Sequence, residues 1–218
     1  MANPAYNTTL EMTGTSTGMT AEAMTGSGAG PYQITNSAKR VINPLVALIF
    51  YDNAVDCTAD VLTIDYLFGK VTFTGSKTGP ITVTGEYLPR LTFAEAKATT
   101  WTFSADKLDT TVFNSTGWKT SIQGLKELAV VVESLALPDT DMDGGAGSRT
   151  IEDVWSNDTS VLLSLNPGNT GDIYRAFVSM TDFEAANSVA DLVNTKCSFS
   201  SIAITAANGD IVSPSQGT

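Results

Sequence analysis

The segment Ile64–Leu88 constrains the fold of this chain more than any other stretch. Apolar and polar residues alternate on both sides of Gly75–Pro80, which is typical of the two strands of a β-hairpin. We expect these strands at Val71–Thr74 and Ile81–Thr84. Alternation with a period of two places one face of each strand on a core and the other in solvent, so the pattern predicts a β-sheet protein.

Further segments rich in Val, Thr and Ser also predict strands. In Leu91–Ser104 the even positions are all small, which predicts one strand of about 13 residues, roughly 43 Å long at about 3.3 Å per residue. One short helix is expected at Ser148–Trp155, where Thr150 can cap the first turn. The remaining predicted strands are Leu45–Tyr51, Val61–Tyr66, Glu127–Leu137, Val161–Leu165, Ile173–Met180 and one or two within Val189–Ile204. The sum predicts a mainly β fold, a sandwich or barrel with one short α-helix.

The composition divides the chain into three parts. Residues 1–31 are rich in Thr, Gly, Ser and Met and predict a flexible N-terminal arm that orders on a partner surface. Residues 32–209 predict a single β-sandwich domain, and residues 210–218 predict a polar C-terminal tail. Methionine suits an adaptable contact surface, so the arm is a candidate for contact between subunits. The candidate inter-subunit residues are Met12, Met19, Met24 and Lys77.

The charge balance limits the possible partners. The 218 residues include 12 basic and 23 acidic side chains, for a formal net charge of −11. Binding to nucleic acid or to an anionic membrane depends on Lys and Arg, so neither specific DNA binding nor membrane attachment is expected. The first residues have no basic or strongly apolar region of a secretory signal, and no apolar run reaches the roughly 20 residues of a membrane helix.

The sequence offers no catalytic constellation. It contains no histidine, which excludes Ser-His-Asp and Cys-His mechanisms and the usual acid–base residue at neutral pH. The string Gly14–Gly18 matches G-x-S-x-G, but no base is present to activate its serine. Cys57 and Cys197 are far apart and predict two reduced, buried thiols. We therefore expect no enzymatic activity and no cofactor.

One acidic segment is the weak candidate for a metal site. Asp139, Asp141 and Asp143, followed by Gly144, match the first positions of an EF-hand calcium loop. The twelfth position is Thr150 in place of glutamate, and the preceding segment predicts a strand. A solvated acidic turn explains the segment without a metal, and weak calcium binding is the alternative.

Several segments, taken in order, form a set that spans about residues 40–200, most of the chain. They are Lys39–Val41 with Pro44, Ile64–Phe73, Val83–Leu88, Asp109–Phe113, Gly117–Lys119, Gly124–Glu127, and Val189 with Ser198–Ser200. This ordered set resembles the major tail (tail tube) protein of long, non-contractile-tailed bacteriophages.

The resemblance implies a β-sandwich with a flanking helix and long arms, six copies in a ring, and rings stacked into a tube in the virion tail. Strands of each subunit would join into a barrel around a lumen through which DNA passes without specific binding. The implied partners are other copies of the chain and the tape-measure, tail terminator and distal tail or baseplate proteins. Assembly would occur in the host bacterial cytoplasm.

Acidic residues that face the lumen would repel DNA phosphates. Glu127 and Glu133 share one face of a predicted strand and are the candidate lumen residues, with the outer wall as the alternative. The rival function is an extracellular β-sandwich binding module, an adhesin or carbohydrate-binding domain stabilised by calcium. It would use Trp101, Trp118 or Trp155 as a stacking platform.

Overall fold

A computed structural model describes residues 9–92, 96–109, 121–135, 161–166, 173–186 and 194–217. The described residues form two large antiparallel β-sheets, one two-stranded sheet and two 3-10 helices. The predicted mainly β fold is confirmed. Neither 3-10 helix corresponds to the predicted α-helix, because residues 148–155 lie outside the described residues. No helix within the described ranges is long and apolar enough to cross a membrane.

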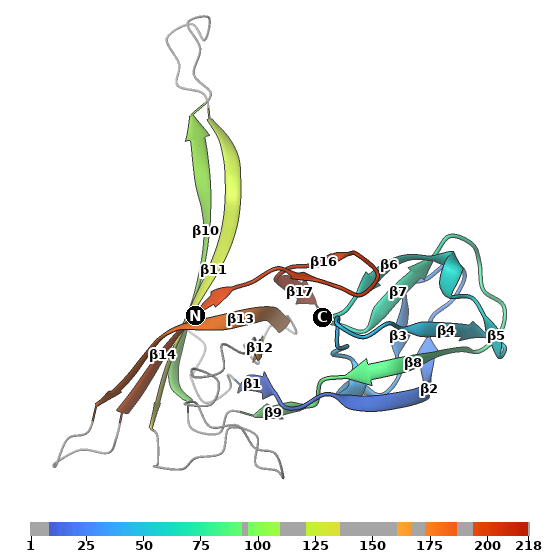
Figure 1. The fold of residues 1–218 in the computed structure, drawn as a ribbon, viewed down its shortest axis with the longest axis horizontal. Coiled ribbons are helices and arrows are strands. Elements are labelled where there is room, and N and C mark those ends of the chain that lie inside the picture. The colour runs from blue at the N-terminus through green and yellow to red at the C-terminus, as the bar shows by residue number, and fades with distance from the viewer. Residues whose placement is uncertain are drawn as a thin grey trace, which may run out of the picture.

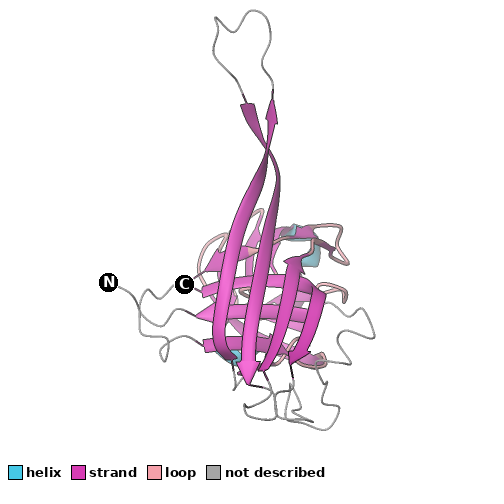
Figure 2. Cartoon of the chain, turned by 90° about the vertical axis from the view of Figure 1, so that its left-hand side faces the viewer, coloured by secondary structure: helices cyan, strands magenta, loops and turns pink. Residues whose placement is uncertain are grey.

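The first sheet, on the left in Figure 1, contains the longest strands of the chain. Its order is β10-β11-β14-β13-β12-β1-β9, and β17 pairs with the first residues of β13. The hairpin of β10 and β11 extends far beyond the rest of the molecule (Figures 1 and 2). The strands are β1 (Thr9–Thr13), β9 (Arg90–Thr92), β10 (Ala96–Asp109), β11 (Ser121–Leu135), β12 (Val161–Asn166), β13 (Ile173–Ala186), β14 (Asn194–Ser201) and β17 (Ser215–Gly217).

The second sheet, on the right in Figure 1, is built from residues 17–87. Its order is β5-β4-β8-β2-β3-β7-β6. Its strands are β2 (Thr17–Thr25), β3 (Tyr32–Ile34), β4 (Ile49–Asp52), β5 (Val55–Asp56), β6 (Val61–Asp65), β7 (Lys70–Phe73) and β8 (Ile81–Tyr87). The smaller elements are β15 (Ile204–Thr205) with β16 (Ile211–Val212), η2 (Ser37–Lys39) and η3 (Thr58–Asp60).

Two apolar clusters stabilise the two sheets. The larger one consists mainly of residues from the second sheet and includes Phe50, Phe73 and Ile34. Phe50 and Tyr32 pack edge-on against Phe73. The smaller one lies on one face of the first sheet and includes Leu128, Val130 and Phe199. Burial of such side chains contributes about 1.5–3 kcal/mol each, so these clusters supply the main folding force.

Arg175 connects the two sheets. Its guanidinium, on β13, is only 3% exposed. Nη1 donates to the carbonyl of Leu67 at 2.5 Å, Nε donates to Ser164 Oγ at 3.4 Å, and the guanidinium carbon lies 4.6 Å from the ring centre of Phe68. Burial lowers the pKa of this guanidinium to about 10. Buried arginine is stabilised by such hydrogen bonds and aromatic stacking, so this contact fixes the turn after β6 against the first sheet.

The predicted hairpin of residues 71–84 is wrong in its pairing, although both strands exist. β7 pairs with β6 and β3, whereas β8 pairs with β4 and β2. The hairpin is instead β6–β7, closed by a turn in which Asp65 Oδ1 accepts hydrogen bonds from the amides of Leu67 and Phe68. Gly69 completes the turn with φ +62, where a Cβ would lie 2.7 Å from the carbonyl oxygen of Arg40.

The predicted arm and tail are also corrected. Residues 9–25, assigned to a flexible arm, form β1 in the first sheet and β2 in the centre of the second. Part of 210–218, assigned to a polar tail, forms β16 and β17. Both segments are ordered because they complete ladders of backbone hydrogen bonds that neighbouring strands leave open. Whether residues 32–209 are a single domain stays a prediction.

Other predicted boundaries differ by several residues. The strand expected at 45–51 begins only at Ile49, since Leu45 lies in an exposed turn. The long strand expected at 91–104 is divided between β9 and β10, and β10 continues to Asp109. β11 begins six residues before the expected Glu127 and β13 ends six residues after the expected Met180. The strand at Val161–Leu165 is confirmed, with one additional residue.

Replacement of Arg175 tests the contact between the sheets. Arg175→Ala leaves the Leu67 carbonyl and the Ser164 hydroxyl without their donor, so we expect the free energy of unfolding to fall by about 2–4 kcal/mol. Urea denaturation followed by circular dichroism measures it. Lys196→Ala, at an exposed position of the same sheet, is the control and should change stability by less than about 0.5 kcal/mol. Equal effects of the two substitutions would contradict the assigned role.

Candidate functional site

Four strands of the first sheet present a face with almost no large apolar side chain. The register places one side chain from each of β10, β11, β14 and β13 in successive rows, and these side chains are exposed or half-buried. We call this surface the polar face. Its residues are Ala98, Thr100, Thr102, Ser104, Glu127, Ala129, Val131, Glu133, Ser179, Asp182, Glu184, Lys196, Ser198 and Ser200.

The opposite face of the same strands explains why the polar face points to solvent. Leu128, Val130 and Val132 of β11 alternate with the polar-face residues and are buried in the smaller core cluster, as are Cys197 and Phe199 of β14. Because strand side chains alternate between faces, burial of one set exposes the other. The apolar residues of each strand therefore determine the orientation of the sheet.

Acidic side chains dominate the charge of the polar face. Glu127, Glu133, Asp182 and Glu184 are exposed there, and the register places Lys196 between Glu133 and Glu184. Ser200 Oγ donates to Glu127 Oε1 at 3.1 Å. The sequence analysis placed Glu127 and Glu133 together on one face, and the structure does bring them to the same exposed face. That this face lines a lumen stays a prediction.

Two of the acids, Asp182 and Glu184, were missed by the sequence analysis. The predicted strand ended at Met180, and the register shift between Met180 and Asp182 changes which residues point outward. No local signal identifies this β-bulge, so residues beyond it cannot be assigned to a face from alternation alone.

The polar face is bounded by two backbone edges. Within the described residues, β10 pairs only with β11, so its other edge is open. Residues 179–186 of β13 pair with β14 on one side, while β12 reaches only as far as Val178 on the other. Among the described strands none pairs with this second edge. Each edge presents a row of backbone donors and acceptors suited to pairing with another chain.

Beyond β14 the hairpin continues without sheet neighbours among the described strands. We call residues 103–109 of β10 and 121–128 of β11 the hairpin arm; eight residues at about 3.3 Å each make it roughly 26 Å long (Figure 2). Leu108, Ile122 and Leu125 on this arm are 54%, 57% and 83% exposed. An apolar cluster on a projecting hairpin indicates a protein contact.

The structure gives a different account of the predicted inter-subunit residues. Met19 and Met24 are 2% and 9% exposed and pack in the larger core cluster, inside their own chain. Met12 lies in β1, opposite Leu163 in the register. Lys77 Nζ forms an ion pair with Asp60 at 2.5 Å. Of the predicted contact residues, Met19, Met24 and Lys77 therefore have their partners within the chain.

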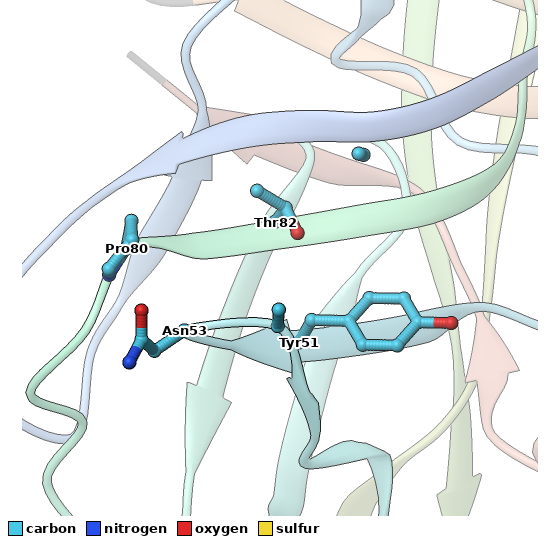
Figure 3. A pocket seen from close by; sticks show the side chains of 6 residues that line it. Tyr51, Asn53, Pro80 and Thr82 are labelled. Carbon is cyan, nitrogen blue, oxygen red and sulfur yellow. The ribbon is translucent and has the colours of Figure 1, made fainter.

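One surface groove, of about 470 Å³, lies across β4, β8 and β2 (Figure 3). Its polar groups are the side chains of Tyr51, Asn53 and Thr82, and Ala54 and Pro80 supply apolar walls. No described residue that lines it is charged or carries a thiol, so the groove holds neither an acid–base pair nor a cysteine nucleophile. Asn53 and Ala54 adopt positive φ, as expected for the two-residue turn between β4 and β5.

The metal and aromatic candidates that fall among the described residues add no other site. Within the described ranges no group of three or more His, Cys, Asp or Glu side chains is arranged to hold a metal ion. Asp139, Asp141 and Asp143 lie outside those ranges, as do Trp118 and Trp155. Trp101 is half-buried against the smaller core cluster, so it does not form an exposed stacking platform for a sugar.

The solved structures similar to this chain include chains of assembled particles. No protein-family model and no curated protein matches the chain. One similar structure is the tail of an empty gene transfer agent particle, with C6 symmetry: TM-score 0.45, 16% identity, covering 57% of this chain and 86% of that one. Another is the virion of a native gene transfer agent particle: TM-score 0.44, 17% identity, covering 57% and 88%.

Both are structures of tail or virion particles.

The two cysteines test the packing of the two core clusters, Cys57 in the larger and Cys197 in the smaller. Burial raises the pKa of Cys197 to about 12 and also raises that of Cys57. We expect neither thiol to react with a disulfide reagent at pH 8 in the folded protein, and both to react after unfolding in urea. Because the unfolded thiols ionise first, stability should fall as the pH rises from about 9 towards 12. Rapid labelling of Cys197 in the folded protein would contradict its burial.

Proposed function

We propose that the chain is a structural subunit of a phage-like tail and polymerises into the tail tube. The single observation that carries the proposal is the pair of edges on either side of the polar face, on β10 and on residues 179–186 of β13, that no described strand covers. These edges differ in sequence, so they can join head to tail, and a head-to-tail contact closes a ring when its rotation allows.

Strand directions permit such joining without rearrangement. Neighbouring strands in the order β10-β11-β14-β13 are antiparallel, so β10 and β13 run in opposite directions. When the edge of β13 meets β10 of the next copy, the new pair is therefore antiparallel too. The polar face continues across the junction, and every copy contributes four strands to one closed barrel that has no free edge.

A barrel of six copies, the number that the sequence resemblance implies, is wide enough for DNA. Twenty-four strands spaced about 4.8 Å apart and tilted by about 40° give a backbone diameter of about 48 Å. With about 5 Å taken by side chains on each side, the opening is about 38 Å, wider than a DNA duplex. Three copies would leave about 14 Å, which is narrower than a DNA duplex.

The polar face would line this opening. Small hydroxylated side chains and carboxylates keep it hydrated, and its net negative charge repels phosphates, so DNA can pass without being held. The tube would serve genome delivery, with tape-measure, tail terminator and distal tail or baseplate proteins as partners. The proposed location is the virion tail, after assembly in the host bacterial cytoplasm, and the proposed role is structural.

A proline scan of β10 tests the edge pairing. Single proline substitutions at Thr99, Thr100, Trp101 and Thr102 remove, in turn, an N–H from the β11 ladder or from the open edge, because successive N–H groups of a strand point to opposite edges. The variants that lose an N–H of the open edge should keep the circular dichroism spectrum and melting temperature of the folded chain but should form no rings in electron micrographs. They should alternate along the strand with the variants that lose an N–H of the β11 ladder. If every folded variant still forms rings, β10 is not the joining edge.

Charge reversal tests the lumen assignment. Glu127→Lys with Glu133→Lys replaces two negative charges by two positive ones on the polar face, so assembled tubes should retain duplex DNA at low salt and release it as salt increases. Co-sedimentation of labelled DNA with tubes measures retention. The matched control makes the same change in net charge away from the polar face, with lysine at the exposed positions Leu45, Val55, Leu62 and Ile211. Equal retention by both variants would place Glu127 and Glu133 outside the lumen.

A further inference from the structure

The face of the hairpin arm changes character at a β-bulge. In the pairing of β10 with β11, Ala105 lies opposite Lys126 and Lys107 lies opposite Gln123. Gly124 and Leu125 on β11 therefore both oppose a single residue of β10, Asp106. Below the bulge this face carries the small residues and acids of the polar face. Above it, Leu108 and Ile122 lie opposite each other on the same face, and Leu125 follows the alternation of Glu127. We call Leu108, Ile122 and Leu125 the tip cluster.

The opposite face of the hairpin has a cavity at the base of the arm. Trp101, Phe103 and Leu128 line one side of it, and Tyr174 and Pro214 line the other. Its volume is about 190 Å³, below the roughly 300–1,000 Å³ of small-molecule sites and suited to one or two aliphatic side chains. We call it the base cavity.

Two features of the base cavity indicate that a protein segment completes it. Phe103 is 60% exposed although its ring centre lies 6.0 Å from that of Tyr174. The indole Nε1 of Trp101 is buried and has no acceptor among the described residues. A buried donor without a partner costs about 1–3 kcal/mol, so an acceptor brought in by a docked segment would stabilise the contact.

We propose that the tip cluster of one copy docks in the base cavity of another copy. The tip cluster supplies aliphatic side chains of a size that the largely aromatic cavity can hold. A β-bulge leaves its extra residue outside the ladder, so a carbonyl at Gly124 or Leu125 is available to accept from Trp101 Nε1 of the next copy. The acceptor and the apolar side chains come from the same short segment.

The docking of tip cluster in base cavity can repeat from copy to copy along a line. The tip cluster and the base cavity lie on opposite faces and at opposite ends of the same hairpin arm, so the contact is head to tail and extends into a filament. It uses neither the edge of β10 nor that of β13, and so it can coexist with ring closure. The inference rests on the proposed function in assigning this contact to the stacking of rings.

A disulfide between copies tests the docking directly. Leu125→Cys with Ser215→Cys, where Ser215 also lines the base cavity, should give a ladder of cross-linked species under mild oxidation. The control pair is Leu62→Cys with Ser215→Cys. Leu62 is exposed, as Leu125 is, but it lies outside the proposed contact, so this variant should remain monomeric on a denaturing gel. An equal ladder from the control pair, or no ladder from the test pair, would overturn the docking.

Two further variants separate this inference from the proposed function. Leu125→Asp should leave single rings in electron micrographs and reduce stacked tubes at least tenfold, whereas Leu62→Asp should leave tubes unchanged. Trp101→Phe keeps an aromatic ring but removes the indole N–H, and should raise the concentration needed for stacking several-fold. Tubes of normal length from Leu125→Asp would contradict the docking while ring formation stands. If the unaltered chain forms no rings, edge pairing is contradicted. The docking is still tested in that case, because the cross-linked ladder does not depend on ring formation.

Discussion

Unpaired backbone edges govern the arrangement of this molecule. Every strand needs partners for its N–H and C=O groups, and the second sheet places its long strands β2 and β8 at the centre, so that its edges are the short strands β5 and β6. The first sheet differs, because β10 and the second half of β13 each retain one open edge among the described strands. Long open edges cause indiscriminate aggregation unless a specific partner covers them. The proposed pairing between copies would satisfy both edges at once.

The contact between the sheets determines where those edges point. Arg175 lies in the half of β13 that pairs with β12, before the half that is open on one side. Its hydrogen bond to Leu67 and its stacking on Phe68 hold the turn of the second sheet against that first half. β17 reinforces the junction, since Gly217 approaches the Phe68 ring so closely that a Cβ there would clash with it. The open half of β13 is thereby kept clear of its own second sheet.

The sequence predicts strands better than it predicts their neighbours. Alternation located β7 and β8 because each has an apolar side to bury, but pairing depends on chain segments far away. Met19 and Met24 show the limit: they are five residues apart, which in an unbroken strand would place them on opposite faces. The register shift between Met19 and Glu22, where Ala21 has φ 47, brings both inward. The polar face was foreseen where strands are regular and missed beyond bulges.

The composition of the polar face fits passage of DNA better than binding of DNA. Each lysine that contacts a phosphate adds a salt-dependent attraction, and large apolar side chains would offer a surface for adhesion. Threonine and serine supply hydration in a small volume, and threonine also favours the strand conformation. The one lysine on this face, Lys196, has Glu133 on one neighbouring strand and Glu184 on the other. Flanking carboxylates would compete with phosphate for that ammonium group, so we do not expect Lys196 to hold DNA.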